Sequence, residues 1–125
     1  MPMRGIRGAT TVETDTPEEI WAVTQEMGRE ILDKNHLLPE NIGAIILSAT
    51  GDLTSAFPAT GIRKLPGFDL VPLFDAQQLN VDNSLSRCIR MLVLAETDLS
   101  QAQIRHVYLR GAKKLRPDLA KEREE

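Results

Sequence analysis

The segment Cys88-Ile89-Arg90-Met91-Leu92-Val93-Leu94-Ala95 decides the fold class, because it is an almost continuous apolar run. A run that is apolar at both odd and even positions predicts a strand buried on both faces of a sheet. Arg90 interrupts this run, and an arginine is almost never buried without a partner, since an unpaired buried charge is very costly. We therefore expect Arg90 to meet an anion, either a carboxylate of the protein or one of a ligand.

The N-terminal segment 3–12 carries a second arginine, Arg7, and also predicts a strand. Gly5 and Gly8 leave room there for another group to approach the backbone closely. Further strands are predicted at residues 44–48, 69–74 and 105–110, from short apolar or alternating runs. Together with the run around Arg90, these segments predict a sheet of five strands.

One long helix is predicted between the first two strands. Thr16 is suited to cap it, Pro17 to occupy its first position and Glu19 to complete a capping box. Apolar residues at helical spacing continue from Ile20, so the helix is expected over residues 17–34.

The remaining segments are a short helix, expected over residues 59–65, and a polar stretch, 75–86, that predicts a loop. The order of elements predicts an α/β (α+β-like) fold: a single domain over residues 1–125 with a mixed five-stranded sheet, one main covering helix and a mobile tail at 117–125. One helix cannot cover both faces of such a sheet. The open face is therefore expected to meet another copy of the chain in a homo-oligomer.

The composition is that of an ordinary soluble globular protein, with 125 residues, 42% hydrophobic, 26% charged and a net charge of -3. With a net negative charge, the protein has no overall positive field that would attract nucleic acid. No apolar run approaches the ~20 residues of a membrane span. We expect neither kind of partner. The N-terminus lacks the apolar region of a signal peptide, and the single cysteine, Cys88, excludes an internal disulfide, so a cytoplasmic location is expected.

Motifs of several large enzyme classes are missing from the sequence. It has no phosphate-binding glycine loop, no Gly-x-Ser-x-Gly elbow and no Cys/His cluster at metal-ligand spacing. Neither a metal nor another cofactor is expected. Cys88 is interpreted as a small buried residue, and His106 as a surface or packing residue.

What remains is a set of cationic and hydroxyl groups on predicted strands, Arg7, Arg90 and Tyr108, with Arg63 and Arg116 further away. Guanidinium groups bind carboxylates in a bidentate way, and a tyrosine hydroxyl adds one more donor. Such a set suits a small dianionic ligand. The alternative is a set of structural ion pairs with the protein's 18 acidic residues.

Several segments of the chain resemble, in order and without large gaps, the small monofunctional bacterial chorismate mutases of the trimeric pseudo-α/β-barrel class. These segments are 4–12, 47–53, 56–59, 88–90 and 103–109, and the terminal segment 115–119 matches as well. The likeness covers nearly the whole chain.

The resemblance implies an isomerase that converts chorismate to prephenate by a Claisen rearrangement, in phenylalanine and tyrosine biosynthesis. Such a pericyclic reaction requires no nucleophile, base or metal, which agrees with the missing motifs. Catalysis then rests on holding a compact conformer of the substrate and on matching the charge of the transition state. The ether oxygen becomes partly negative, so an arginine fixed beside it binds the transition state better than the ground state.

The resemblance also implies roles for particular residues. Arg90 would face the ether oxygen and one carboxylate, while Arg7 and Tyr108 would make other substrate contacts. The implied substrate-binding residues are Phe57, Ala59, Arg63, Phe74, Leu115 and Arg116, of which Phe57, Ala59 and Arg63 would come from the neighbouring subunit of a homotrimer.

The loop expected after the third strand departs from the family's pattern. The family has a Cys and, three residues later, a Glu that contacts the ring hydroxyl and faces the developing positive charge, whereas this chain has Asp75 and Gln78. Our hypothesis is that Asp75, kept ionised by neighbouring arginines, supplies the charge while Gln78 orients the hydroxyl, which a turn joining the two positions would allow. The alternatives are a solvated Asp75 in an enzyme of reduced activity, and a non-catalytic trimer that binds a carboxylate metabolite.

Overall fold

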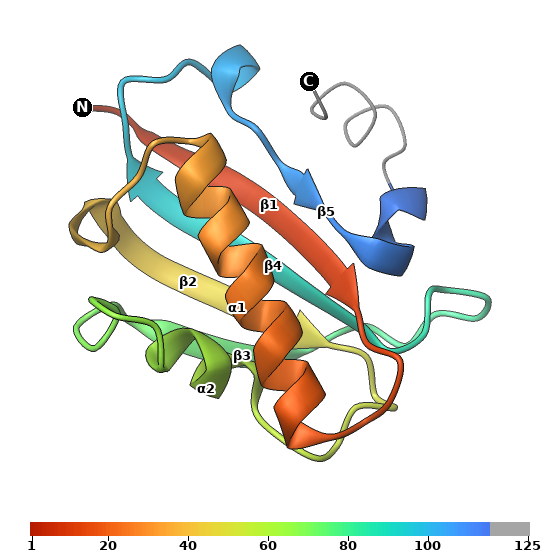
Figure 1. Cartoon of the computed structure of the whole chain (residues 1–125). Helices are drawn as coiled ribbons and strands as arrows, with labels where there is room; N and C mark the ends of the chain where they lie inside the picture. The colour runs from red at the N-terminus through yellow and green to blue at the C-terminus, as the bar shows by residue number, and fades with distance from the viewer. Residues whose placement is uncertain (116–125) are drawn as a thin grey trace.

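A computed structural model describes residues 1–115 as a five-stranded mixed sheet with one main helix, which confirms the predicted fold class. Arg116 and the expected tail, 117–125, lie outside the described residues. The elements are β1 (Met3–Thr11), α1 (Pro17–Lys34), η1 (Pro39–Asn41), β2 (Ile42–Ala49), α2 (Pro58–Arg63), β3 (Leu73–Gln77), β4 (Cys88–Glu96), η2 (Gln101–Gln103), β5 (Val107–Tyr108) and η3 (Arg110–Lys114), where η marks a 3-10 helix. The strands lie in the order β3-β2-β4-β1-β5 (Figure 1).

The arginine-containing run forms β4, the central strand of the sheet. It pairs antiparallel with both β1 and β2, while β3 and β5 are parallel additions at the two edges. Ile89, Met91 and Val93 are fully buried on the side that carries the helices, as expected. Arg90 and Leu92 are only half-buried on the other side, so within one chain the run is fully buried on one face and not on both.

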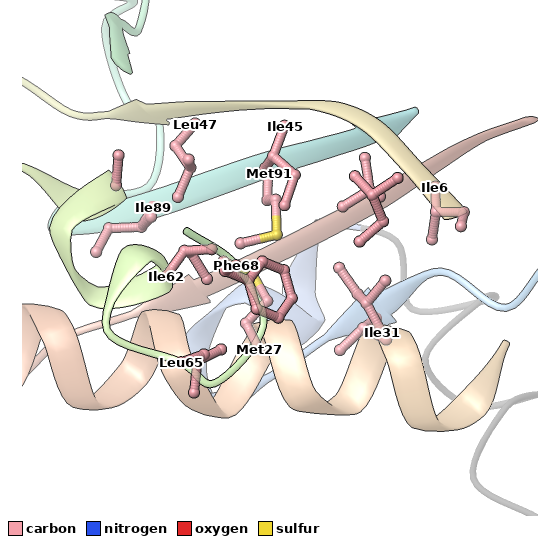
Figure 2. Packing of buried hydrophobic residues seen from close by; sticks show 14 of the residues in the cluster. Ile6, Met27, Ile31, Ile45, Leu47, Ile62, Leu65, Phe68, Ile89 and Met91 are labelled. Carbon is pink, nitrogen blue, oxygen red and sulfur yellow. The ribbon is translucent and has the colours of Figure 1, made fainter. Parts of the chain in front are cut away.

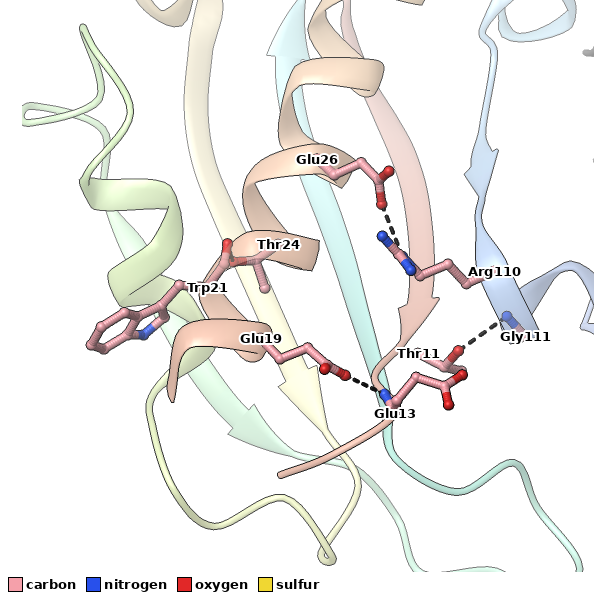
Figure 3. Close-up of polar contacts among 8 residues, drawn as sticks. All are labelled: Thr11, Glu13, Glu19, Trp21, Thr24, Glu26, Arg110 and Gly111. Atoms are coloured by element: carbon pink, nitrogen blue, oxygen red, sulfur yellow. Dashed lines mark hydrogen bonds and ion pairs between the residues drawn. The ribbon is translucent and has the colours of Figure 1, made fainter. Parts of the chain in front are cut away.

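The long helix α1 has the predicted bounds and begins as its sequence indicates. Thr16 Oγ1 accepts a hydrogen bond from the N–H of Glu19 (3.2 Å), and Pro17 occupies the first turn. The Glu19 carboxylate does not complete the expected capping box at Thr16. It accepts instead from the backbone N–H groups of Thr14 (3.0 Å) and Glu13, and so also fixes the chain between β1 and α1 (Figure 3).

The hydrophobic core lies between α1 and the sheet (Figure 2). Ile20, Val23, Met27 and Ile31 form the buried stripe of the helix, at the spacing that the sequence predicts. The short helix α2 packs beside α1 on the same side of the sheet and adds Ile62 to the core (Figure 1). Neither α1 nor α2 covers the opposite side of the sheet.

Two predicted strands have bounds that differ from those in the structure. The third strand is β3, which starts at residue 73 rather than 69 because its pairing with β2 begins where Leu73 lies opposite Ile45. The expected loop 75–86 is therefore wrong at its start. The last strand is only two residues long, since β5 is an edge strand that pairs with β1 alone, and Arg110 then adopts a φ of 52° in the left-handed region.

The segment after β5 is tied to the rest of the molecule by side-chain contacts. Arg110 Nε donates to Glu26 Oε1 of α1 (3.1 Å), and the N–H of Gly111 donates to Thr11 Oγ1 of β1 (3.0 Å; Figure 3). These contacts hold η3 beside the end of β1. In the described part of the chain, no helix is both long and apolar enough to cross a membrane.

The Gly61→Ala substitution should separate the two helices. A Cβ at Gly61 would lie 2.1 Å from Thr24 Oγ1 and 3.0 Å from the Cα and carbonyl oxygen of Trp21, so the backbones must move apart. Overpacking of this kind costs about 1–3 kcal/mol, and we expect a matching loss in the free energy of unfolding measured with urea. Gly43→Ala is the control, since a Cβ there meets no atom closer than 3.7 Å. Equal urea midpoints for the two variants would contradict the prediction.

Candidate active site

The register of the sheet brings the two strand arginines and the tyrosine to one face. Arg90 lies opposite Ala9 in the antiparallel pair, Ala9 pairs with Tyr108 on its other side, and Arg7 lies opposite Leu92. Arg7, Arg90 and Tyr108 line one cavity of about 250 Å³ on the side of the sheet that faces away from α1. We call these three residues together with Gln78 the sheet group.

Arg90 has no carboxylate partner among residues 1–115, where the ion pairs are Lys34–Glu30 and Arg110–Glu26. Its Nε is buried and has no hydrogen-bond partner within the same residues. The guanidinium lies beside the buried Cys88 thiol, whose pKa burial raises and the Arg90 charge lowers in part. The sequence left two anions open for Arg90, a carboxylate of the protein or a carboxylate of a ligand. Because residues 1–115 provide no carboxylate for it, the structure favours a ligand.

Gln78 extends the same face just beyond the end of β3. Its N–H donates to the carbonyl oxygen of Ala49 (3.1 Å), so it continues the parallel ladder, and the two-residue period of a strand puts it on the side of Arg90. Its Oε1 is buried without a hydrogen-bond partner in residues 1–115. The sheet group thus contains two buried polar atoms that have no partner within residues 1–115, one a donor and one an acceptor.

A second group forms around the start of α2 and consists of Phe57, Ala59, Arg63 and Asp75; we call it the helix group. Asp75 lies opposite Leu47 on the helix side of the sheet, and its Oδ1 accepts a hydrogen bond from the N–H of Ala59 (3.1 Å). Phe57, 71% exposed, lines with Asp75 a cavity of about 500 Å³.

The surroundings of Asp75 bear on its charge and on its place in the fold. Burial raises the pKa of its carboxyl above the ordinary 3.8, and this effect outweighs the lowering by the Ala59 N–H and by the Arg63 charge, although Arg63 does favour the ionised form as expected. Asp75 is a strand residue that binds α2, not a solvated loop residue. Within one chain Asp75 and Gln78 point to opposite faces, so the expected turn that joins them is absent.

The remaining candidate residues lie at the edges of these groups. Phe74, 66% exposed, lies opposite Ile46 on the face of the sheet group. Leu115 packs against the cluster that contains Tyr108. The candidate residue Arg116 is outside the described residues. A larger cavity, of about 900 Å³, lies on the helix side between α1 and the end of α2, away from both groups.

Sequence reasoning missed the role of His106. Its Nδ1 accepts a hydrogen bond from the backbone N–H of Arg7 (2.9 Å), so the histidine holds β1 at the residue that enters the cavity. An accepting Nδ1 requires that the proton of a neutral ring be on Nε2. The two residues are 99 positions apart, and only the pairing of β5 with β1 brings them together. No metal-binding group of His, Cys, Asp or Glu side chains occurs in the described residues.

Comparisons with known proteins agree on one family. A family model described as chorismate mutase type I matches residues 3–119. Chorismate mutase AroH of Bacillus subtilis is 48% identical over 120 residues, covering 96% of this chain and 94% of that protein. Chorismate mutase AroH of Thermus thermophilus is 50% identical over 118 residues, covering 94% and 96%. A solved chorismate mutase from Clostridium thermocellum superposes with a TM-score of 0.86 at 41% identity, covering 89% of this chain and 98% of that chain.

Proposed function

This chain belongs to the type I chorismate mutase family, and we propose that it holds its substrate between two subunits of a homotrimer. The chain is an isomerase that converts chorismate to prephenate in aromatic amino acid biosynthesis. The observation that carries the proposed site is the sheet group, in which the half-buried Arg90 has a buried Nε and no carboxylate partner among residues 1–115 and lies beside a second arginine and a tyrosine. Loss of chorismate absorbance on addition of the protein tests the activity directly.

The sheet group supplies the electrostatic part of the mechanism. Chorismate carries two carboxylates, and Arg7, Arg90 and Tyr108 offer the donors to fix both. We assign Arg90 to the ether oxygen, which gains negative charge as its bond to the ring breaks. A preorganised guanidinium at that point stabilises the transition state more than the ground state and so raises kcat.

The separation of the two groups within one chain supports a site made by two chains. The sheet group and the helix group lie on opposite faces of the same sheet, so one chain cannot close both around one small molecule. The open sheet face also exposes apolar side chains, Phe74 at 66% and Ile46 at 38%, which suits burial against a second copy. Phe57, Ala59, Arg63 and Asp75 would then reach the substrate from the neighbouring subunit, with Leu115 and Arg116 closing the site.

This arrangement would bring the Asp75 carboxylate, which lies where the family has a Cys, to the substrate. Asp75 of one subunit and Gln78 of the next would approach the ring of chorismate from its two sides, although they point apart within one chain. The ring fragment gains positive charge in the transition state, and an ionised Asp75 would stabilise it. Gln78 Oε1, buried and unpartnered among the described residues, would accept the hydrogen bond of the ring hydroxyl.

The Asp75→Asn substitution should lower kcat at neutral pH by about tenfold or more, and Gln78→Ala by clearly less. Asparagine keeps an oxygen that can accept from the N–H of Ala59, so the variant removes the charge and retains the contact with α2. Because burial raises the pKa of Asp75, kcat of the wild type should fall on acidification at a pH above the ordinary 3.8 of aspartate. Asp75→Asn should lose this acidic limb.

Steady-state kinetics from acidic to neutral pH distinguish the alternatives. Equal small effects of both substitutions would mean that Asp75 only caps α2. A large gain from Gln78→Glu alone would mean that the charge is missing from the site rather than supplied by Asp75.

We also propose a cytoplasmic location. A single cysteine that is buried and free suits a reducing compartment, where disulfides rarely persist.

A further inference from the structure

The residue just before β4 has an uncommon backbone conformation. Arg87 has a φ of 46°, in the left-handed region where the Cβ of an L-residue crowds the following carbonyl. Its carbonyl oxygen accepts a hydrogen bond from the N–H of Val12 (3.0 Å), so the conformation also sets how β4 meets the end of β1. Arg90 follows three residues later, so the direction of its backbone depends on how the chain enters β4 at Arg87.

An exposed carboxylate holds this conformation in place. The N–H of Arg87 donates to both oxygens of Asp52, at 3.0 and 3.2 Å. The Thr50 hydroxyl donates to Asp52 Oδ1 (2.5 Å) and accepts in turn from the N–H of Cys88 (3.0 Å). The N–H of Thr50 donates to the carbonyl oxygen of Cys88 (3.0 Å). Two residues of the loop after β2 thus bind Arg87 and Cys88 from one side.

Cys88 connects this contact to Arg90. The two residues are two positions apart in β4, so their side chains share a face, and the guanidinium of Arg90 lies beside the thiol. The Cys88 side chain is fully buried. Because Arg90 has no carboxylate partner in residues 1–115, its direction depends on the backbone frame and on this neighbour.

We propose that Asp52 is a positioning residue for Arg90, acting through the left-handed conformation of Arg87 and the fixed position of Cys88. The inference rests on the proposed catalytic role of Arg90. Without the carboxylate, Arg87 is free to relax to a negative φ, which moves the first residues of β4 and redirects the guanidinium. Transition-state stabilisation is sensitive to displacements well below 1 Å, so a small shift is enough to slow the reaction.

The test combines a loss with a rescue. Asp52→Ala should lower kcat by about tenfold with a smaller change in KM, because the developing charge is affected more than ground-state binding. Asp52→Asn should lose less, since its amide oxygen still accepts from the N–H of Arg87. Adding Arg87→Gly to Asp52→Ala should restore most of kcat, because glycine adopts a positive φ without the Cβ penalty. Arg87→Gly alone should leave kcat close to the wild-type value.

A second readout does not depend on activity. Cys88 is the only thiol in the chain, and its rate of reaction with a thiol reagent reports how often the start of β4 opens. This rate should rise in Asp52→Ala and return towards the wild-type rate in the variant that also carries Arg87→Gly. Thr16→Ala is the matched control, since it removes the cap of α1 and lowers global stability without touching β4.

The outcomes separate this inference from the proposed function. A normal kcat in folded Arg90→Ala would remove the catalytic role and the inference with it. If the Arg90→Ala variant has a low kcat while the Asp52→Ala variant has a normal kcat and normal thiol reactivity, the proposed function stands and this inference is overturned. The inference would also be overturned if the Asp52→Ala variant lost kcat and the added Arg87→Gly substitution did not restore it. If Asp52→Ala does not fold, Asp52→Ser takes its place, because its hydroxyl is too short to reach Arg87 in the same way.

Discussion

Folded Arg90→Ala protein is expected to convert chorismate with a kcat lower by about two orders of magnitude or more. One fixed donor aimed at a developing oxyanion commonly contributes about 3–4 kcal/mol, which corresponds to this loss of rate. Arg90 is placed for such a role, since its Nε is buried without a partner in the described residues and its side chain lines the cavity with Arg7 and Tyr108. Steady-state kinetics on the purified variant measure the effect.

Two controls isolate the charge of Arg90. Citrulline at position 90 keeps nearly the shape of arginine and removes its charge, so it should lose about as much kcat as alanine. Arg29→Ala removes an exposed arginine on α1, outside both groups, and should leave kcat unchanged. A folded Arg90→Ala protein with near-normal kcat would refute the assigned role.

Mixing Arg90→Ala with Arg63→Ala protein should restore activity that neither variant has alone. Arg90 belongs to the sheet group and Arg63 to the helix group, so a site between subunits takes one arginine from each chain. The two proteins are unfolded, mixed in equal amounts and refolded. Random assembly then places both arginines in about one quarter of the interfaces. The recovered kcat per site should then approach about one quarter of the wild-type value.

A second mixture provides the matched control. Arg90 and Arg7 belong to the same group, so a mixture of Arg90→Ala with Arg7→Ala protein should recover nothing, because each interface takes both from one chain. Recovery in that mixture, or its absence in the first, would contradict the composite site. A monomer in sedimentation at working concentration would contradict it as well.

Much of the fold could be predicted because its signals are local. Thr16 and Pro17 mark the start of α1 within the segment itself, and the spacing from Ile20 to Ile31 defines its buried face. The run around Arg90 predicts the central strand by composition alone. Failures occur at the edges of the sheet, where β3 and β5 are defined by their partners and not by their own residues.

The candidate site was predicted in its residue types and only partly in its arrangement. The strand arginines and Tyr108 meet on one face because the register places Ala9 opposite both Arg90 and Tyr108, and Arg7 opposite Leu92, which the alternation within each strand does not determine. The face taken by Asp75 depends on its pairing opposite Leu47, and nothing within residues 75–78 indicates that pairing. The contact of His106 with Arg7 joins residues that are far apart in sequence, so no local pattern reports it.

The sequence by itself determined the long helix α1, the apolar centre of the sheet and the presence of an arginine that needs an anion. These follow from side-chain chemistry and from periodicities that each segment carries alone. The tertiary structure alone decided that Asp75 and Gln78 point to opposite faces, and that Asp52 binds the backbone of Arg87, 35 residues further along the chain. Such choices depend on strand register and on loops that meet only after folding, because a shift of one residue would turn every side chain of a strand to its other face.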